Sequence, residues 1–345
     1  MLLDLSLEEL NNYVSDLGLP KFRAKQIFDA LYMAKTLEEI TNLPKDLKEN
    51  LSKDYPKWEI LKILESKDGT KKMALKLQDG SIVESVLLKY KYGYTVCVST
   101  QVGCRMGCKF CASTIGGLKR NLSAGEILLQ VLIYNKILGG TIKDRKVTNV
   151  VLMGCGEPLD NYENVTKFLT LISSPDGINI SQRNISLSTC GLVPNIRKLA
   201  DDGFNVTLTI SLHAPNDEIR KKTMPIANVY KIKDILSACD YYFEKTGRRV
   251  IFEYSLIDGV NASEENMLEL SKVLKGRSCH VNLIPLNSVK EKNLMGVERK
   301  RAYYLCGILE KNGISATVRR TMGEDIEGAC GQLRNKLGGA VWKED

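Results

Sequence analysis

The chain has 345 residues, of which 43% are hydrophobic, and Lys plus Arg outnumber Asp plus Glu by 49 to 41, a net charge of +8. This size and apolar share are ordinary for a globular protein with one large domain, or one large and one small. No apolar run approaches the roughly 20 residues that span a bilayer, and no basic stretch opens the N-terminus, so we expect a cytoplasmic protein that does not enter the membrane. The moderate positive charge permits a polyanionic partner without identifying one.

Residues 1–55 are predicted to form a small helical module. Ser6 and Glu9 make a capping box in front of helically spaced apolar residues, and a second helix follows after a Gly-Leu-Pro turn. We expect a third element to open at Thr36 and to end at Pro44. The basic residues of the module face either ordinary solvent or an RNA; they are Lys21, Arg23, Lys25, Lys35, Lys45 and Lys48.

The hydrophobic pattern changes to a period of two in residues 56–93. Asp-Gly pairs at 68–69 and 79–80 are hairpin turn signals that separate three short strands. We therefore predict an antiparallel meander that joins the helical module to the rest of the chain. Glu84 falls within the last of these strands, and the default expectation for it is a carboxylate on the surface.

A cysteine triplet follows, with the spacing C-x3-C-x2-C at Cys104, Cys108 and Cys111. Structural zinc and ordinary iron–sulfur carriers usually take four protein ligands, so the triplet is one ligand short. An iron–sulfur cluster with three protein ligands keeps one iron open to a small molecule, and the spacing resembles that of radical S-adenosylmethionine (SAM) enzymes. The alternative is a zinc site completed by one of the other cysteines, such as Cys97 at the end of a predicted strand.

Strands and helices alternate in the part of the chain that follows. The predicted helices are 123–138, 162–173, 194–202, 231–246, 263–275 and 298–312. The predicted strands are 147–153, 184–189, 205–212, 249–256, 280–284 and 314–318. Alternation of this length predicts an α/β fold with a parallel sheet curled into a full or partial barrel, with ligands at the carboxyl ends of the strands. We assign residues 94–320 to this barrel and 321–345 to a C-terminal segment.

Polar residues stand at the predicted strand ends. The sequence G-C-G-E-P follows strand 147–153, and its Glu157 offers a carboxylate that can hold an ammonium group, while the glycines allow close approach by a ligand. Other residues at these strand ends are Ser188, Ser211 to His213, and Asn287. Taken one at a time, each is more often an ordinary loop or strand-end residue than a ligand contact. The chain has two histidines, which argues against a His-rich metal site. Two further cysteines are Cys97 and Cys330. The ordinary interpretation of each is a small apolar side chain that is buried in the core.

The complete set of motifs closely resembles the RlmN and Cfr family of radical SAM enzymes, which methylate an adenine carbon in ribosomal RNA. The resemblance covers nearly the whole chain, through L-G-L-P-K-F-R-A-K-Q-I, C-V-S-T-Q-V-G-C-R-M-G-C-K-F-C-A-S-T, M-G-C-G-E-P-L-D-N-Y, S-L-H-A-P, N-L-I-P-L-N and A-C-G-Q-L. C-A-S-T-I-G-G and G-E-P-L-D-N-Y are similar to the RlmN branch, which modifies C2; the Cfr branch modifies C8 and differs in both places. Cys155 departs from the family pattern, which leads us to expect methionine there.

This resemblance implies a partial (β/α)6 barrel of the radical SAM type, similar to a TIM barrel, with a [4Fe-4S] cluster and SAM as cofactors. The cluster ligands would be Cys104, Cys108 and Cys111. Residues that carry over as SAM contacts are Gly156, Glu157, Ser188, Ser211, Leu212, His213 and Asn287.

The scheme of the family gives Cys330 the central role. Its thiolate takes a methyl group from one SAM, and a second SAM is cleaved reductively to methionine and a 5′-deoxyadenosyl radical. That radical removes hydrogen from the methylated Cys330, and the resulting carbon radical adds to C2, which joins enzyme and RNA. Cys97 would resolve this adduct through a transient disulfide with Cys330. Glu84 occupies the position of a proton acceptor, although Cys97 could also fill that role.

The resemblance further implies that the substrates are 23S rRNA and certain tRNAs. A flavodoxin-like electron donor and a thiol reductant are implied as partners, and we expect a monomer because the substrate is larger than the enzyme. The basic residues of the helical module then become the expected RNA-docking element. A net charge of +8 predicts RNA binding that weakens as salt rises.

Three other interpretations stay open. A Cfr-type enzyme would place the methyl group at C8. A zinc-stabilised RNA-binding protein without catalysis would close the cysteine triplet with Cys97. A glycyl-radical activating enzyme would share the cluster and the G-x-G-E-P motif, but it would need neither Cys97 nor Cys330.

Overall fold

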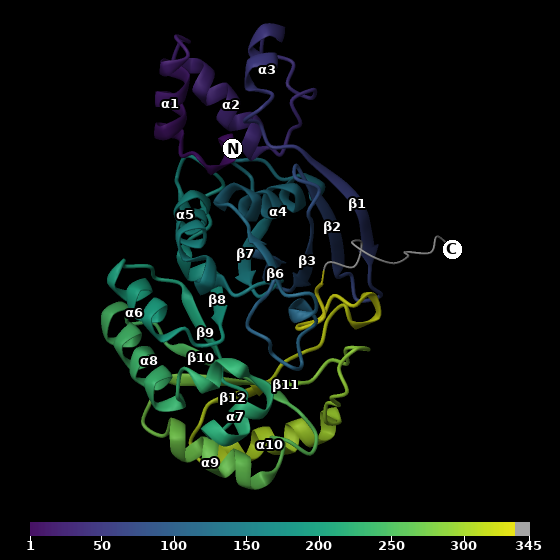
Figure 1. Ribbon diagram of the computed structural model, residues 1–345, viewed down its shortest axis with the longest axis vertical. Coiled ribbons are helices and arrows are strands. Elements are labelled where there is room, and N and C mark those ends of the chain that lie inside the picture. The colour runs from purple at the N-terminus through teal and green to yellow at the C-terminus, as the bar shows by residue number, and fades with distance from the viewer. Residues whose placement is uncertain (335–345) are drawn as a thin grey trace.

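Ten strands form one continuous sheet in the computed structural model, which describes residues 1–334. In their order across the sheet they are β1 (Trp58–Glu65), β2 (Lys71–Leu77), β3 (Ile82–Tyr90), β4 (Gly93–Cys97), β7 (Val147–Leu152), β8 (Ile185–Thr189), β9 (Thr207–Ser211), β10 (Val250–Leu256), β11 (Cys279–Pro285) and β12 (Ala316–Val318). Neighbours are antiparallel from β1 to β4 and parallel from β4 to β12. The sheet bends through the molecule as an open curve (Figure 1).

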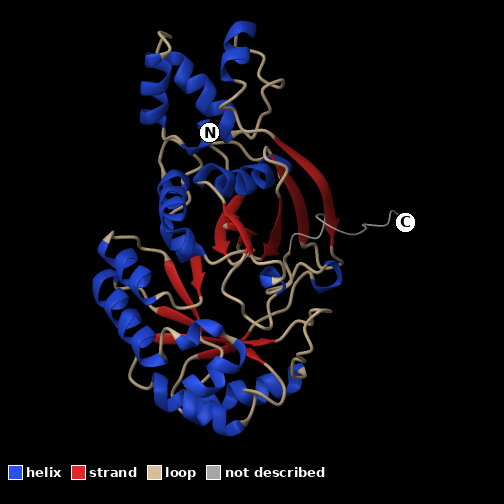
Figure 2. Cartoon of the chain, in the orientation of Figure 1, coloured by secondary structure: helices blue, strands red, loops and turns tan. Residues whose placement is uncertain are grey.

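Helices connect the parallel strands and lie mostly on the outer side of the curve (Figure 1). They are α4 (Ala124–Ile137), α5 (Tyr162–Ser173), α6 (Val193–Asp201), α7 (Asp217–Thr223), α8 (Ile232–Thr246), α9 (Glu264–Leu274) and α10 (Arg299–Lys311). Loops gather inside the curve instead (Figure 2). This arrangement confirms the predicted α/β fold, a partial barrel preceded by a meander and a small helical region. None of the helices in residues 1–334 is both long and apolar enough to cross a bilayer.

Three helices form the N-terminal region: α1 (Leu7–Asp16), α2 (Phe22–Tyr32) and α3 (Lys45–Leu51). The predicted capping box is present, since the Ser6 hydroxyl accepts from the N–H of Glu9, and the Glu9 carboxylate accepts from the N–H of Ser6. The prediction of a third element between Thr36 and Pro44 was wrong. A turn lies there, and α3 begins directly after Pro44, because the fixed φ of proline suits the start of a helix better than its end.

Helix α4 links the helical region to the sheet. It is buried on nearly all sides, because it contacts β4 and β7 on one side and α5 and the short η1 (Leu2–Asp4) on others. Buried apolar residues of α1, α2 and α3 belong to the same core cluster as those of the barrel strands. This shared core stabilises the position of the N-terminal helices over one end of the sheet (Figure 1).

Candidate active site

A short hairpin fixes the base of the cysteine loop. Strand β5 (Gln101–Gly103) pairs antiparallel with β6 (Leu118–Asn121), which brings the two ends of the loop together. Gly103 has a φ of +81°, and a Cβ atom there would lie 1.9 Å from the carbonyl oxygen of Gly117. The same carbonyl accepts the N–H of Cys104 at 3.1 Å. Only glycine fits at this crossing, so the loop leaves the hairpin in one direction. The sequence did not predict this hairpin or helix α7.

The cysteine triplet borders a cavity of about 910 Å³, which we name the triplet cavity. Cys104, Cys108 and Cys111 all contribute to its wall. The other predicted residues that border it are Gly156, Glu157, Ser188, Ser211, His213, Asn287 and Cys330. They come from the carboxyl ends of the parallel strands and from the C-terminal segment, which is where ligands bind in barrels of this kind.

The triplet thiols suit a metal cluster. Burial raises the pKa of all three, that of Cys104 to about 12. Positive charge from bound iron is what converts such buried thiols into thiolates. Within residues 1–334, no group of three or more His, Cys, Asp or Glu side chains is positioned so that it could hold a single metal ion. Thiolates are the soft donors that iron–sulfur clusters take, and in a cluster each cysteine binds a different iron.

The turn G-C-G-E-P packs against the chain just before the cysteine loop. A Cβ at Gly154 would lie 2.6 Å from the carbonyl oxygen of Val98, and one at Gly156 would lie 2.7 Å from the Cβ of Gln101. We predicted that these glycines make room for a ligand. Much of that room is occupied by the neighbouring backbone, so the glycines also allow two strand ends to meet closely.

Glu157 presents a buried carboxylate to the triplet cavity. Its two oxygens accept the N–H groups of Cys190 at 2.8 Å and Leu159 at 3.1 Å. Burial is the largest influence on the pKa of Glu157 and raises it, although both hydrogen bonds oppose the change. No Lys or Arg of the described chain forms an ion pair with this carboxylate. An ammonium group of a ligand would supply the positive charge that the site lacks.

Three polar side chains of neighbouring strand ends face the same cavity. The hydroxyl oxygens of Ser188 and Ser211 are 3.4 Å apart. His213 follows β9 with a φ of +54°, and its Nδ1 accepts the N–H of Ser255 at 2.9 Å. Burial lowers the pKa of His213 to about 3, so its ring is neutral at physiological pH and carries its proton on Nε2. His213 can therefore donate a hydrogen bond but does not act as a cation.

Leu212 is the predicted SAM contact that does not border the cavity. Its side chain is fully buried in the core. Its N–H donates to the carbonyl of Glu253 at 3.1 Å, and its own carbonyl accepts from Nε of Arg220 at 3.1 Å. These two hydrogen bonds fix the backbone of Leu212 and thereby position its neighbours Ser211 and His213.

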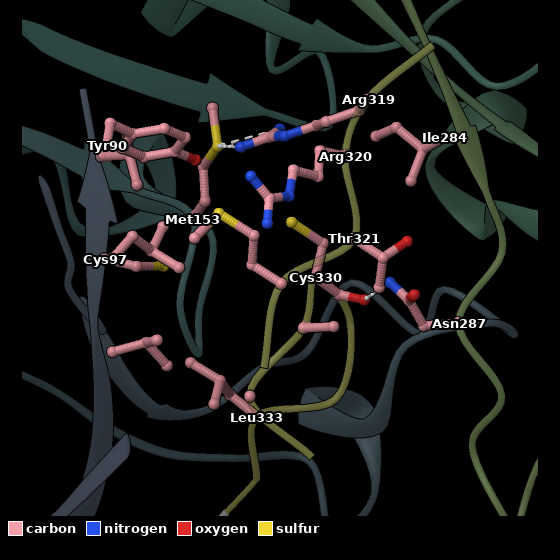
Figure 3. A pocket seen from close by; sticks show the side chains of 16 residues that line it. Tyr90, Cys97, Met153, Ile284, Asn287, Arg319, Arg320, Thr321, Cys330 and Leu333 are labelled. Atoms are coloured by element: carbon pink, nitrogen blue, oxygen red, sulfur yellow. Dashed lines mark hydrogen bonds between the residues drawn. The ribbon is translucent and has the colours of Figure 1, made fainter. Parts of the chain in front are cut away.

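A second cavity, of about 590 Å³, contains both of the other predicted cysteines, and we name it the two-thiol cavity. Cys97 ends β4, whereas Cys330 comes from the C-terminal segment, and the two lie on different sides of the cavity (Figure 3). The sequence indicated burial as the ordinary state of both. Cys97 is buried, but the side chain of Cys330 is exposed.

Cys330 stands where the two cavities meet. Four residues border both cavities: Met153, Ile284, Asn287 and Cys330. The Nδ2 group of Asn287 donates to the carbonyl of Cys330 at 3.0 Å, and the N–H of Ala112 in the cysteine loop donates to the carbonyl of Gly331 at 2.8 Å. These bonds attach the segment that carries Cys330 both to the end of β11 and to the cysteine loop.

Arg319 places a fixed cation beside the two thiols. Its guanidinium forms an ion pair with Glu253 and borders the two-thiol cavity. Cys330 has the largest influence on the pKa of Arg319 and raises it, burial opposes this, and Glu253 raises it further. Burial raises the pKa of Cys97 to about 12, and Arg319 partly offsets that change. A neighbouring guanidinium of this kind stabilises a cysteine as the thiolate.

The default expectation for Glu84, a surface carboxylate, was wrong. Its side chain is only 3% exposed, lies 3.2 Å from the ammonium of Lys72, and accepts the N–H of Arg334 at 2.6 Å. Glu84 borders neither cavity. It shares a strand face with Val86, which does border the two-thiol cavity, and the C-terminal segment covers it. Any contact with a ligand in that cavity would require this segment to move.

Several site residues were not predicted. Glu253 had a detectable signal, because a carboxylate stands within the mostly apolar strand V-I-F-E-Y-S-L. Arg319, Met153 and Tyr90 had none, since nothing in their local sequence distinguishes them from ordinary strand-end residues. Their place in the site follows only from the curvature of the sheet.

Comparisons with known proteins agree over nearly the whole chain. The family model "Radical SAM superfamily" matches residues 98–271, and the model "Ribosomal RNA large subunit methyltransferase N-terminal domain" matches residues 1–55. Relatives named "Probable dual-specificity RNA methyltransferase RlmN" include one from Clostridium perfringens, 54% identical, and one from Lachnoclostridium phytofermentans, 53% identical. These matches cover 96% of this chain and 96% and 93% of the two relatives.

A solved structure also matches this chain over nearly its full length. It is described as a radical SAM methyltransferase from Sphaerobacter thermophilus, and it is 42% identical to this chain with a TM-score of 0.92. The match covers 96% of this chain and 98% of that one.

Proposed function

Because the chain belongs to the RlmN family of radical SAM RNA methyltransferases, we propose that it methylates C2 of adenosine 2503 in 23S rRNA and of adenosine 37 in certain tRNAs. The observation that carries this proposal is the position of Cys330 at the junction of the triplet cavity and the two-thiol cavity. A thiol at such a junction can take up a one-carbon group on one side and deliver it on the other.

The chemistry of the target explains why a carrier is needed. Carbon 2 of adenine is not nucleophilic, so it cannot attack the methyl group of SAM directly. A carbon radical must be brought to it, and radical chemistry of this kind is supplied by a cofactor, while the protein supplies position and electrostatics.

The residues of the triplet cavity fit the two cofactors of the family. Cys104, Cys108 and Cys111 would hold a [4Fe-4S] cluster with one iron open, and Glu157 would bind the amino group of SAM. Ser188, Ser211 and the neutral His213 would hydrogen-bond the rest of the molecule. When bound, the cluster supplies the electron for the reductive cleavage of SAM, which is the source of the carbon radical.

Cys330 is the proposed methyl carrier. Its Sγ, as the thiolate, would take a methyl group from SAM, with S-adenosylhomocysteine as the leaving group, beside the guanidinium of Arg319 in the lining of the two-thiol cavity. The 5′-deoxyadenosyl radical would take a hydrogen atom from the methylated Cys330 and become 5′-deoxyadenosine, and the methylene carbon would then form the bond to adenine C2 in the two-thiol cavity. The adduct would lose one electron to the cofactor and the C2 proton to a base before Cys97 acts. The Nδ2 group of Asn287, 3.0 Å from the carbonyl of Cys330, would hold the carrier segment at the junction during both steps.

Cys97 is the proposed resolving thiol. Its Sγ would attack Sγ of Cys330, forming an S–S bond and breaking the S–C bond to the modified base. We expect Cys97→Ala to accumulate enzyme joined covalently to RNA, visible as a retarded band on a denaturing gel after anaerobic reaction, because Cys97 and the carrier Cys330 itself are the two described thiols that border the two-thiol cavity.

A second variant, Glu84→Gln, is compared with Cys97→Ala. It distinguishes Glu84 from Cys97 as the group that accepts the C2 proton. If Cys97 removes the C2 proton, Glu84→Gln should retain turnover within a few-fold. If Glu84 does, the variant should also accumulate adduct. A Cys97→Ala protein that turns over normally without adduct would contradict the resolving role of Cys97.

The proposed partners follow from the RNA substrate. Extrusion of an adenine into a cavity is easiest from a loop, where the base is already unpaired. We propose that the basic side chains of the N-terminal helical region dock the RNA. Lys21, directly before α2, and Lys25, within α2, are both exposed. A flavodoxin-like donor would supply electrons, and a thiol reductant would reopen the transient disulfide. We propose a cytoplasmic monomer.

The position of the methyl group tests the function. Wild-type protein, reconstituted anaerobically with iron, sulfide, SAM and a reductant, should convert the target adenosine of 23S rRNA to 2-methyladenosine, identified by mass spectrometry against both isomers. The isomer 8-methyladenosine would assign the chain to the C8-methylating branch instead. No methylated adenosine from either rRNA or tRNA would contradict the proposed activity.

A further inference from the structure

Two tyrosines form a stacked pair at the hairpin between β3 and β4. Tyr90 pairs with Gly93 across the hairpin, so Lys91 and Tyr92 make the two-residue turn. The rings of Tyr90 and Tyr92 have centroids 4.9 Å apart and planes inclined by 7°. Parallel stacking of two rings in a solvent-facing turn fixes both side chains in one orientation.

The stack runs from the two-thiol cavity to the surface. Tyr90 borders that cavity together with Cys97 and Cys330, and its position is visible in Figure 3. Tyr92 continues the stack outward and is 64% exposed. A large aromatic side chain that is ordered by stacking yet remains this exposed offers a free ring surface at the edge of the reaction site.

The charges around the stack suit a nucleic acid strand. Lys91, in the turn between the two tyrosines, is exposed. Arg320, also exposed, belongs to the lining of the same cavity (Figure 3). The segment K-Y-K-Y-G-Y has no acidic residue. Cations that flank aromatic rings are the arrangement that binds single-stranded RNA, with the cations at phosphates and the rings under bases.

We propose that Tyr90 and Tyr92 form a stacking platform for an unpaired nucleobase next to the target adenosine. The inference rests on the proposed function, in which the target base occupies the two-thiol cavity. When that base leaves its stack, its neighbour loses a stacking partner, and the exposed ring of Tyr92 replaces it. Stacking on an aromatic ring tolerates any base, which suits an enzyme that acts on two kinds of RNA.

The test uses full-length protein and RNA hairpins that carry 2-aminopurine on one or the other side of the target adenosine. Stacking quenches the fluorescence of this base analogue. Wild-type protein should quench one of the two probes, and Tyr92→Ala should lose most of the quenching. We expect the dissociation constant and the KM for RNA to rise about 5- to 20-fold in Tyr92→Ala, near the lower end of base-stacking energies, with kcat within about twofold.

Two further variants separate stacking from general disturbance. Tyr92→Trp keeps an aromatic surface and should retain quenching and KM. Tyr303→Ala removes a tyrosine of α10 that is 54% exposed and borders neither cavity, and it should behave as wild type.

The outcomes distinguish the platform from the proposed function. If Tyr92→Ala quenches the probe and binds RNA as wild type does, the platform is overturned while methylation by wild type still supports the function. If wild type quenches through Tyr92 yet methylates no adenosine, the platform is supported and the proposed function is overturned.

Discussion

Replacement of Cys330 by alanine is expected to reduce formation of 2-methyladenosine by about a thousandfold or more, to the limit of detection. In the proposed mechanism, the carbon that reaches the base is carried on this sulfur, so alanine would remove a covalent intermediate and not merely a contact. We expect no other cysteine to substitute, because Cys330 is the one cysteine among residues 1–334 that borders both cavities. The measurement is mass spectrometry of nucleosides from 23S rRNA after anaerobic reaction.

The control for this experiment is Cys306→Ala. Cys306 is buried in α10 and is not part of either cavity, so its replacement tests the effect of losing a thiol as such. The side chain of Cys330 is exposed, which makes loss of folding in Cys330→Ala unexpected, and equal iron content in both variants would verify this. Methylation that survives in Cys330→Ala would show that the carrier mechanism is wrong.

The second large effect is expected for Cys108→Ala. With two of three thiolate ligands left, the cluster should not assemble, and iron should fall from about four per chain to below about one. The brown colour and the cleavage of SAM should be lost together. Measurements are iron and sulfide content, visible absorption and release of 5′-deoxyadenosine.

Cys190→Ala is the matched control. Cys190 borders the same cavity and packs beside Cys108, but it is not one of the triplet. Alanine keeps the hydrogen bond from the backbone N–H to Glu157 and loses only the contact of the Cys190 thiol with the same carboxylate. Iron that persists in Cys108→Ala and disappears in Cys190→Ala would contradict the assigned ligands. Colourless wild-type protein with one zinc per chain would favour the zinc-binding alternative, although Cys97 borders a different cavity from the triplet.

Local sequence signals predicted most elements of the barrel within one or two residues. Helix α4 is an example, because Ser123 and Glu126 form its predicted capping box. The errors occurred where local signals conflicted or were weak. Pro44 was assigned to a helix end but lies at the start of α3, and the β5–β6 hairpin is too short to produce a periodic pattern.

The sequence by itself determined the kind of chemistry. Soft thiols in the spacing C-x3-C-x2-C and a carboxylate after a strand are typical of a cluster and a bound ammonium group, and motifs over nearly the whole chain carry the family resemblance that implies SAM and an RNA substrate. These signals are readable because each depends on neighbouring residues, whose geometry is set by backbone hydrogen bonds and side-chain periodicity.

Only the tertiary structure decided how those groups meet. It placed Cys330 between two cavities, Cys97 across one of them, and Arg319 beside both thiols. It buried Glu84 against Lys72 under the C-terminal segment, and it stacked Tyr92 on Tyr90 at the edge of the site. The physical reason is that contacts between distant segments depend on the curvature of the sheet and on side-chain packing, which the local pattern of residues does not encode.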